Sequence, residues 1–385
     1  MSSRIEWVVG AEALRPWADA WNALAAAQQL PMLTWAWVDA YARTLLQHGA
    51  ELHVALALDE RDRLVGVLPL VVRRSGIGRL SVASAATPYS PHSAFGDLIT
   101  DASHAPATAP SLLASACVRS GLHLREVTLR GVPATSPTLA PLRFAPPPRS
   151  ACAIHPRGWG SFLPTASDWS AYRETLSKNF RANLRKAHNR IREAGTGAPE
   201  YLWLEGQDAS PDHLETFLAL EAGGWKGEAG SAIGQDATVR RFYTALCENA
   251  HRLGALEWHF MMFEGRAVAA HMAWRCERSL VLLKIAYDER LGRFSPGSLL
   301  FEATADRAFA HAATDEINCL TDMAWHRPWN MARREYFDLR VFPQSLIGIT
   351  LGQTPSTLKR ALKSVAEKSP RWREFRARLH KIAKE

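Results

Sequence analysis

Residues 279–310 read SLVLLKIAY-DERLGRFSPG-SLLFEATADRAFA. The pattern predicts an apolar strand over 279–287, a loop that ends in Ser-Pro-Gly, and a helix that begins at Ser298. A glycine-containing loop before a helix leaves several backbone N–H groups unpaired, and these groups together with the helix dipole attract phosphate. The stretch therefore indicates a site for a phosphate-bearing ligand, although a plain turn before an ordinary helix accounts for the same residues equally well.

The composition is that of an ordinary globular protein. The 385 residues are 47% apolar and 22% charged, and a chain of this length usually forms two or three domains. No window approaches a membrane-spanning apolar run, and the N-terminus lacks the pattern of a signal peptide. The five cysteines lie far apart without a CxxC pair, which indicates neither a zinc site nor a disulfide framework. We therefore expect no metal and a cytoplasmic location.

Most of the net charge lies at the C-terminal end. Residues 357–385 hold ten Lys and Arg against three Glu, a net of +7 out of +8 for the chain. We expect a basic, amphipathic helical tail over 351–385, interrupted at Pro370. Such a tail suits either an anionic membrane surface, as a peripheral protein at the inner membrane, or docking on the protein's own body. Nucleic acid is disfavoured as a partner because the rest of the chain has no second basic stripe.

The remaining chain divides at a proline-rich stretch between residues 133 and 148. We expect one domain over 1–150 and a second over 151–350. The strands predicted over 64–72 and 267–276 both follow a short charged turn and have similar centres, Val-Gly-Val and Val-Ala-Ala. The sequence thus favours an α/β fold with a mixed sheet, built from two duplicated units. In the second unit the patterns predict helices over 169–194, 211–222 and 238–253, and strands over 200–204, 256–263, 267–276, 280–287 and 316–320.

A basic helix opens the second unit. Ser177 is a plausible N-cap, and Arg181, Arg185, His188 and Arg192 are spaced so that they share one face. This face either meets an anionic ligand or is simply a solvated helix surface.

Several polar residues stand where a ligand site would need them. A glycine-rich loop carries Trp225 and Lys226 directly after a helix that contains Glu221. Such a loop is typical of substrate contacts, but a helix cap that buries the Trp accounts for it too. His271 lies in an apolar strand beside small residues that leave room for a substrate, although a lone strand histidine is more often structural. Lys284, in the next strand, needs an anionic partner if it is buried.

Two more candidates follow the predicted strand at 316–320. Asp322 and His326 stand at positions where carboxylates and imidazoles often serve in catalysis, although turns use the same residues as caps.

Taken together, these segments resemble the GNAT acyltransferase superfamily, and most closely its bacterial CelD/BcsL-like subgroup, which is related to the tandem-GNAT FemABX ligases. The resemblance covers about residues 169–329 well and the first 150 residues loosely. Ser-Pro-Gly stands where the family has its RxxGxG/A signature, and no single Glu stands out as the family's base. The residues that carry the resemblance are 177–192, Glu221 with Trp225-Lys226-Gly227 and Gly230, and 283–288 followed by Ser295-Pro296-Gly297.

The resemblance implies tandem GNAT-like units, of which the N-terminal one is degenerate and shapes the acceptor pocket. It also implies that acyl-CoA binds beside the strand that ends at Tyr287. An acceptor amine would attack the thioester directly, with its carbonyl polarised by a strand amide. Alkylamines are mostly protonated near pH 7, so a base must remove a proton. His271 is the first candidate base, followed by Glu221 and Asp322, and Tyr287 would protonate the departing thiolate. The other implied contacts are Arg293, Ser295, Pro296, Gly297, Ser298 and Leu299 for CoA, and Trp225, Lys226, Lys284, His326 and Arg181 for the substrate.

The resemblance leaves the acceptor open. The family points to amino sugars of polysaccharide biosynthesis, and some relatives acylate lipid amines such as sphingoid bases. Two alternatives are a non-catalytic GNAT-like protein that binds acyl-CoA or serves as a scaffold, and a FemABX-like transferase that uses aminoacyl-tRNA. The second would predict a long coiled-coil arm, which the sequence does not show.

Overall fold

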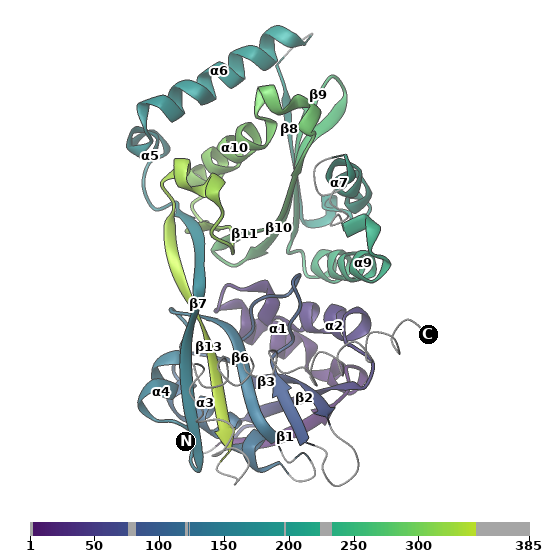
Figure 1. The fold of residues 1–385 in the computed structure, drawn as a ribbon, viewed down its shortest axis with the longest axis vertical. Helices are drawn as coiled ribbons and strands as arrows, with labels where there is room; N and C mark the ends of the chain where they lie inside the picture. The colour runs from purple at the N-terminus through teal and green to yellow at the C-terminus, as the bar shows by residue number, and fades with distance from the viewer. Residues whose placement is uncertain are drawn as a thin grey trace, which may run out of the picture.

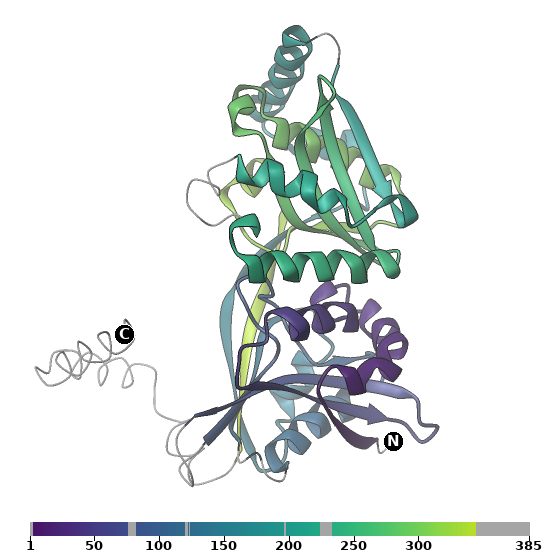
Figure 2. The same ribbon diagram turned by 90° about the vertical axis from the view of Figure 1, so that its right-hand side faces the viewer.

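The computed structural model describes residues 3–75, 82–119, 122, 124–195, 198–223 and 233–343. These residues form two lobes stacked one above the other and joined by two long strands (Figure 1). A view turned by 90° shows the same two lobes and the same connection (Figure 2). The helical tail predicted over 351–385 lies outside the described residues.

The N-terminal lobe begins with a strand, continues with two α-helices, and is completed by strands that are mostly antiparallel. Thr34 is the N-cap of α2, because its hydroxyl accepts a hydrogen bond from the amide of Trp37. The elements are β1 (Arg4–Val9), η1 (Glu12–Trp17), α1 (Ala18–Ala26), η2 (Pro31–Leu33), α2 (Trp35–Thr44), β2 (Ala50–Leu58), β3 (Leu64–Ser75), β4 (Val82–Ala86), β5 (Ile99–Thr100), α3 (Ala105–Val118), β6 (Leu124–Pro133), α4 (Leu139–Phe144) and β7 (Ser150–Pro164).

The C-terminal lobe repeats this plan after two added helices. Its hairpin between β9 and β10 turns at Glu264 and Gly265, whose φ values of 51° and 73° are those of a tight two-residue turn. The elements are α5 (Trp169–Thr175), α6 (Lys178–Ala194), β8 (Glu200–Glu205), η4 (Gly206–Asp208), α7 (His213–Ala222), η5 (Ile233–Gln235), α9 (Ala237–Arg252), β9 (Leu256–Phe263), β10 (Arg266–Cys276), β11 (Ser279–Tyr287), η6 (Glu289–Phe294), α10 (Pro296–Ala310), β12 (Glu316–Asn318), η7 (Ala324–Trp329) and β13 (Ala332–Pro343).

One mixed sheet runs through both lobes. Its order is β1-β2-β3-β4-β6-β13-β7-β12-β11-β10-β9-β8, with β5 paired to β3 off this path. The order contains the same six-strand unit twice. In the first unit β4 pairs with β6 in parallel across the helix α3, and in the second β11 pairs with β12 in parallel across α10. The topology confirms the mixed α/β fold and the two duplicated units, in which the similar strands β3 and β10 hold equivalent places.

The two units exchange their last strands. β7 ends the first unit along the chain but pairs with β12 of the second, and β13 ends the second unit but pairs with β6 of the first. β7 and β13 also pair with each other, from Ala332 opposite Phe162 to Pro343 opposite Ser150. The division of the chain into domains at residue 150 stays a prediction, because this exchange makes one sheet out of both units.

The sequence patterns missed both exchanged strands, and the single helix predicted over 169–194 was wrong. β7 contains Pro156, Gly158 and Gly160, which hide the alternation that marks a strand. The predicted helix is two helices, since α5 ends at Thr175 and α6 begins at Lys178. The Ser177 hydroxyl accepts a hydrogen bond from the Phe180 amide, which confirms Ser177 as an N-cap.

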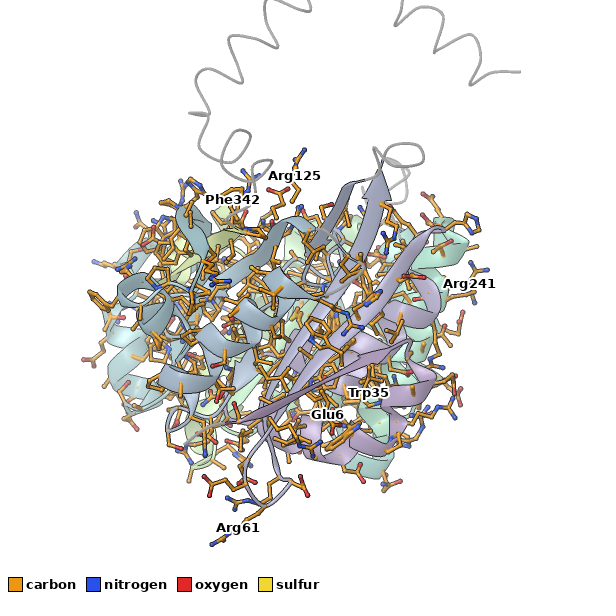
Figure 3. All side chains as sticks on the ribbon, turned by 90° about the horizontal axis from the view of Figure 1, so that it is seen from below. Glu6, Trp35, Arg61, Arg125, Arg241 and Phe342 are labelled. Atoms are coloured by element: carbon orange, nitrogen blue, oxygen red, sulfur yellow. The ribbon has the colours of Figure 1, made fainter. Side chains whose placement is uncertain are left out.

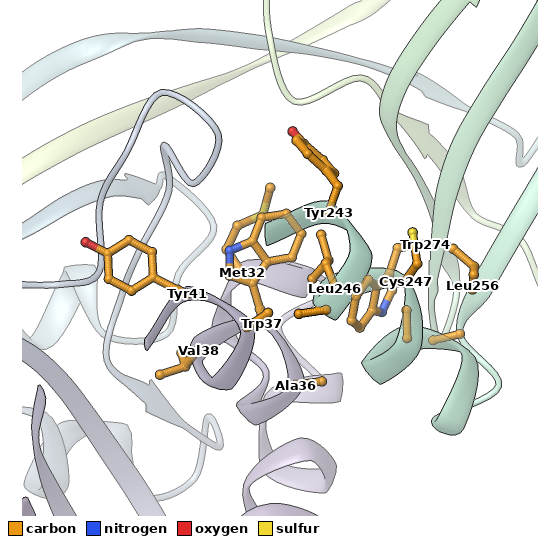
Figure 4. Packing of buried hydrophobic residues seen from close by; sticks show 14 of the residues in the cluster. Met32, Ala36, Trp37, Val38, Tyr41, Tyr243, Leu246, Cys247, Leu256 and Trp274 are labelled. Carbon is orange, nitrogen blue, oxygen red and sulfur yellow. The ribbon is translucent and has the colours of Figure 1, made fainter. Parts of the chain in front are cut away.

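Apolar side chains join the two lobes where α2 lies against α9 (Figure 4). Trp37 is 1% exposed, and its ring lies 5.6 Å from that of Phe242 and 6.1 Å from that of Trp274. Beside these rings the Asn249 side-chain amide donates a hydrogen bond to the carbonyl of Ala36 at 2.7 Å. The lobes therefore share one apolar core as well as one sheet.

Charged side chains lie on the outside of this core. Seen from below, Arg61, Arg125 and Arg241 project from the periphery of the molecule (Figure 3). Arg61 and Arg241 lie on opposite lobes and are both exposed.

Candidate active site

A cavity of about 660 Å³ lies between the lobes. It is found where β11 and β12 separate, because these strands pair only over Ser279–Val281 and Glu316–Asn318 while β11 continues to Tyr287. The rest of β11 thus has no strand partner on that side, and its residues 282–287 line the cavity. The N-terminal lobe contributes Trp37, His92 and Phe95 to the lining.

β11 carries one extra residue in the cavity wall. Ala273 is opposite Leu282 and Met272 is opposite Lys284, so Leu283 has no partner in β10. Such a bulge redirects the backbone locally, and bulges are common beside active sites. The position suits a strand that must offer a backbone group to a ligand.

The N-terminus of α10 lies at the cavity, as the sequence predicts. Ser295 has φ 53° and ψ 49°, which turns the chain sharply into the helix, and Pro296 takes the first helical position. Ser295, Gly297 and Ser298 line the cavity, whereas Pro296 and Leu299 do not. The expectation of unpaired amides was wrong for Ser298 and Leu299, because both donate to the Ser295 carbonyl, at 3.0 and 3.1 Å. The positive end of the helix dipole is therefore directed at this end of the cavity.

Arg293, which the resemblance implies as a CoA contact, does not reach the cavity. Its guanidinium lies 4.5 Å from the ring centroid of Phe294, and the structure does not bring it into the cavity lining. Tyr287 does line the cavity, is 39% exposed, and lies against Gly297.

Glu221 is a buried carboxylate in the cavity wall. It is 4% exposed, and its Oε2 accepts a hydrogen bond from the amide of Ile233 at 2.8 Å. Burial and the charge of Glu221 hold the pKa of the neighbouring Tyr243 well above its ordinary value of 10. The ammonium of Lys284 lies 5.5 Å from the ring centroid of Tyr243. These groups form a polar cluster in a wall that is otherwise largely apolar.

The N-terminal lobe adds His92 to this cluster. Its Nδ1 lies 3.2 Å from the Tyr243 hydroxyl, and the two rings are perpendicular. The next residue, Ser93, accepts a hydrogen bond from the Trp37 indole at 2.8 Å, which fixes the loop against α2. Sequence reasoning missed His92 and Tyr243, since a histidine in a turn-rich loop and a tyrosine in a helix carry no signal of a shared site.

His271 lies deeper in the cavity wall. It is 2% exposed, and its Nδ1 lies 3.3 Å from the Thr304 hydroxyl of α10. Burial, and then the nearby His259, hold the pKa of His271 well below its ordinary value of 6.5. The ring is therefore neutral at pH 7.

The structure separates Asp322 from His326. Asp322 lies outside the cavity lining, where it accepts a hydrogen bond from Ser161 at 3.0 Å and pairs with Arg333 at 2.5 Å. His326 does line the cavity and is 2% exposed. Its Nδ1 accepts a hydrogen bond from the Met323 amide at 3.0 Å, so the neutral ring carries its proton on Nε2.

Three predicted substrate contacts lie elsewhere. Trp225 and Lys226 lie outside the described residues. Arg181 is on α6, which packs over α10, and it does not line the cavity.

Residues 178–322 match the sequence profile of a family described as acetyltransferase (GNAT) domain. The C-terminal lobe has a GNAT-like fold. The CelD/BcsL-like subgroup stays a prediction. No curated protein matches the sequence.

Three solved structures resemble most of the chain in fold. FemX is 10% identical with a TM-score of 0.56, over 83% of this chain and 95% of that one. The C-terminal domain of a putative lysylphosphatidylglycerol synthetase from Agrobacterium fabrum is 12% identical with a TM-score of 0.51, over 89% and 96%. A conserved protein of unknown function from Bacteroides thetaiotaomicron is 14% identical with a TM-score of 0.51, over 85% and 97%. At these identities the likeness concerns the fold alone, and it extends beyond the GNAT-like lobe to both lobes.

The described residues show neither a metal centre nor a membrane span. They hold no cluster of three or more His, Cys, Asp or Glu side chains arranged for a metal ion. Within the same ranges, no helix combines the length and the apolar character that crossing a bilayer requires.

The buried His326 predicts a loss of stability in acid. Burial lowers the pKa of His326 to about 4, against an ordinary 6.5. Between these values the unfolded chain binds a proton that the folded protein does not, so stability falls as the pH drops from about 6.5 towards about 4. We expect urea unfolding midpoints to fall across this window, and the fall to be smaller in His326→Gln. The exposed His48 provides the control, since His48→Gln should keep the wild-type dependence.

Proposed function

We propose that the protein is an N-acyltransferase that moves an acyl group from acyl-CoA to an amine. The match to an acetyltransferase domain supports a transferase. The observation that carries the proposal is the cavity itself. It extends from the N-terminus of α10, past the bulged strand β11, to the polar cluster around Glu221.

The donor end of the cavity suits CoA. The α10 N-terminus provides the positive dipole and the tight turn that a pyrophosphate needs. From there the free edge of β11 offers backbone groups along which the pantetheine arm can lie. The bulge leaves Leu283 without a partner in β10, which supports a role for a backbone amide of this segment in polarising the thioester carbonyl.

Glu221 is the proton acceptor that the geometry supports best. Transfer of the proton from the cationic nitrogen to a buried carboxylate neutralises both groups, whereas transfer to His271 leaves a positive charge on a buried ring. A carboxylate also attracts the ammonium form of the acceptor before reaction. The sequence ranks His271 first, but its complete burial disfavours the imidazolium that a base must become.

The reaction needs no covalent enzyme intermediate. The amine nitrogen attacks the thioester carbon, its proton passes to Glu221 directly or through water, and the carbon–sulfur bond breaks. The thiolate leaves with CoA and takes a proton from Tyr287, which lies at the end of β11 beside the cavity. His326, with its proton on Nε2, and Lys284 contribute positive or polar groups to the acceptor end.

Replacing Gly297 by Asp tests the donor end. A Cβ at this position would meet the Tyr287 ring at 3.2 Å, and the carboxylate would oppose the pyrophosphate at the helix N-terminus. We expect acetyl-CoA affinity, measured by isothermal titration calorimetry, to fall by about 10- to 100-fold. Gly297→Ala makes the same contact with Tyr287 but adds no charge, so its acetyl-CoA affinity should fall much less than that of Gly297→Asp. Equal affinities for the wild type and Gly297→Asp would remove this loop from the CoA site.

The acceptor is proposed only by class. An amino sugar and a lipid amine such as a sphingoid base both fit an apolar cavity with a buried carboxylate. Native mass spectrometry with acetyl-CoA and palmitoyl-CoA, followed by turnover with a panel of amines, tests the function. Preference for the long chain would favour lipid amines, and CoA binding without turnover would favour a non-catalytic binding protein. If the protein binds neither acetyl-CoA nor palmitoyl-CoA, the remaining candidate is a FemABX-like transfer from aminoacyl-tRNA. The similarity in fold to FemX supports that candidate.

A further inference from the structure

The helix α6 presents a row of cations on the outer surface of the C-terminal lobe. We propose that this row docks an acidic carrier protein, which delivers the acyl group as a phosphopantetheine thioester in place of free CoA. The inference rests on the proposed function, because it names the source of that acyl group. The row, called here the basic ridge, comprises two lines of side chains along α6: Lys178, Arg181, Arg185 and Arg192 on one, and Lys186 and Arg190 beside it.

The apolar face of α6 is already used within the lobe. Leu184, Ala187 and Ile191 are at most 3% exposed, and Phe180 packs edge-on against Trp329 at 4.9 Å. On the side towards α10, His188 lies 2.8 Å from Glu302. In Figure 1 the helix lies across the end of the lobe, above α10. The basic ridge is therefore the part of α6 that remains for a partner.

The cations of the basic ridge have no acidic partner among the described residues. Elsewhere the same lobe pairs its arginines closely, as in Arg275 with Glu257 and Arg334 with Glu316, both at 2.7 Å. Two pairs in the ridge, Arg181 with Arg185 and Lys186 with Arg190, are like charges four residues apart, which disfavours the helix. The exposed side of α6 holds only one carboxylate, Glu193, against the six cations of the ridge, so this surface suits an external anionic partner.

The length of the row favours a protein over a single nucleotide. From Lys178 to Arg192 the helix rises by about 21 Å, at 1.5 Å per residue. The few phosphates of one CoA molecule occupy only part of such a row. An acidic helix or patch on a carrier protein matches the row in both length and charge, and electrostatic steering would speed its docking.

The basic ridge is connected to the donor end of the cavity. The Arg190 guanidinium donates to the carbonyl of Arg293 at 3.3 Å, within the turn η6. Gly292, within the same turn, and Ser295, directly after it, line the cavity. A carrier seated on α6 would thus hold its thioester arm beside the opening that the proposed function gives to CoA. The acyl carbon would pass from the carrier's sulfur to the amine nitrogen, with the amine proton going to Glu221 and the free thiol staying on the carrier.

The exposed side of α6 fits a lipid surface less well. Interfacial helices insert apolar side chains, whereas the exposed positions here are Lys, Arg, Asn and Glu apart from the terminal Ala194. The same surface has no exposed aromatic side chain on which a nucleic-acid base would stack.

Charge reversal on α6 tests the docking. We compare palmitoyl thioesters of an acidic acyl carrier protein and of CoA as donors, with one amine acceptor, in the wild type and in R185E/K186E. We expect the ratio of kcat/KM for the carrier donor to kcat/KM for the CoA donor to fall by about 10- to 100-fold in the variant. The control is R61E/R241E, which reverses two exposed charges on other faces and should leave the ratio unchanged. An equal fall in kcat/KM with both donors would show that α6 does not dock the carrier protein.

Direct binding keeps this test separate from the proposed function. Isothermal titration with the carrier protein should show binding that weakens with salt and is lost in R185E/K186E. Absence of carrier binding to the wild type overturns the inference whatever the turnover shows. Carrier binding without transfer from either donor would instead count against the acyltransferase. Binding of anionic vesicles or RNA that requires Arg185 and Lys186, without carrier binding, would assign α6 to those partners.

Discussion

Glu221→Gln should lower kcat by about 10²- to 10⁴-fold, the usual contribution of a general base. The amide keeps the shape of the side chain and can still accept a hydrogen bond from Ile233, so the fold should remain. What it loses is the negative charge that attracts the ammonium and the oxygen that takes its proton. Steady-state kinetics with acyl-CoA and a reactive amine measure the effect.

The control for this variant lies on the same helix. Glu215 is exposed and pairs with Arg240 at 2.7 Å, so Glu215→Gln removes a charge without touching the cavity. Its kcat should stay close to that of the wild type. If Glu221→Gln is nearly as active as the wild type while His271→Gln is not, the base is His271, as the sequence ranks it.

Trp37→Ala should destabilise the whole protein by about 3–5 kcal/mol, as large-to-small changes at buried tryptophans do. The indole fills the space between the lobes, contacts Phe242 and Trp274, and donates a hydrogen bond to Ser93. Its loss leaves a cavity and an unpaired hydroxyl at once. Urea unfolding followed by circular dichroism measures the change.

An exposed tryptophan provides the comparison. Trp159 is 47% exposed and contacts the guanidinium of Arg333, so Trp159→Ala should cost less than about 1 kcal/mol. Similar losses for the two variants would mean that the contact between the lobes adds little to stability.

Local patterns predicted the parts of the fold that local chemistry decides. The Ser177 cap and the neighbouring strands predicted over 256–263 and 267–276 depend on residues close in sequence, and the structure confirms both. The similar centres of β3 and β10 indicated a duplication, which the strand order confirms. The exchange of β7 and β13 was not predictable, because it depends on pairing between segments far apart in the chain.

The candidate site was likewise predicted only where a residue stands out within its own segment. The α10 N-terminus, His271, Glu221, Lys284, Tyr287 and His326 were found because each stands out in its own segment, and the structure brings them to one cavity. His92 and Tyr243 come from different lobes, and only their contact at 3.2 Å marks them. Asp322 stood in an equally suggestive position, but its pairing with Arg333 holds it outside the cavity.

The exchanged strands bear on how the chain arose and on whether either unit can fold alone. In the structure the edges of β6 and β12 are covered by the last strand of the opposite unit, so removing one unit would uncover the edge of the other. This exchange of an equivalent strand is what two copies make in a domain-swapped dimer. The protein thus has the form of a swapped homodimer whose subunits have become one polypeptide. One of the former subunits would have been free to diverge while it still supplied the other with a wall of its cavity.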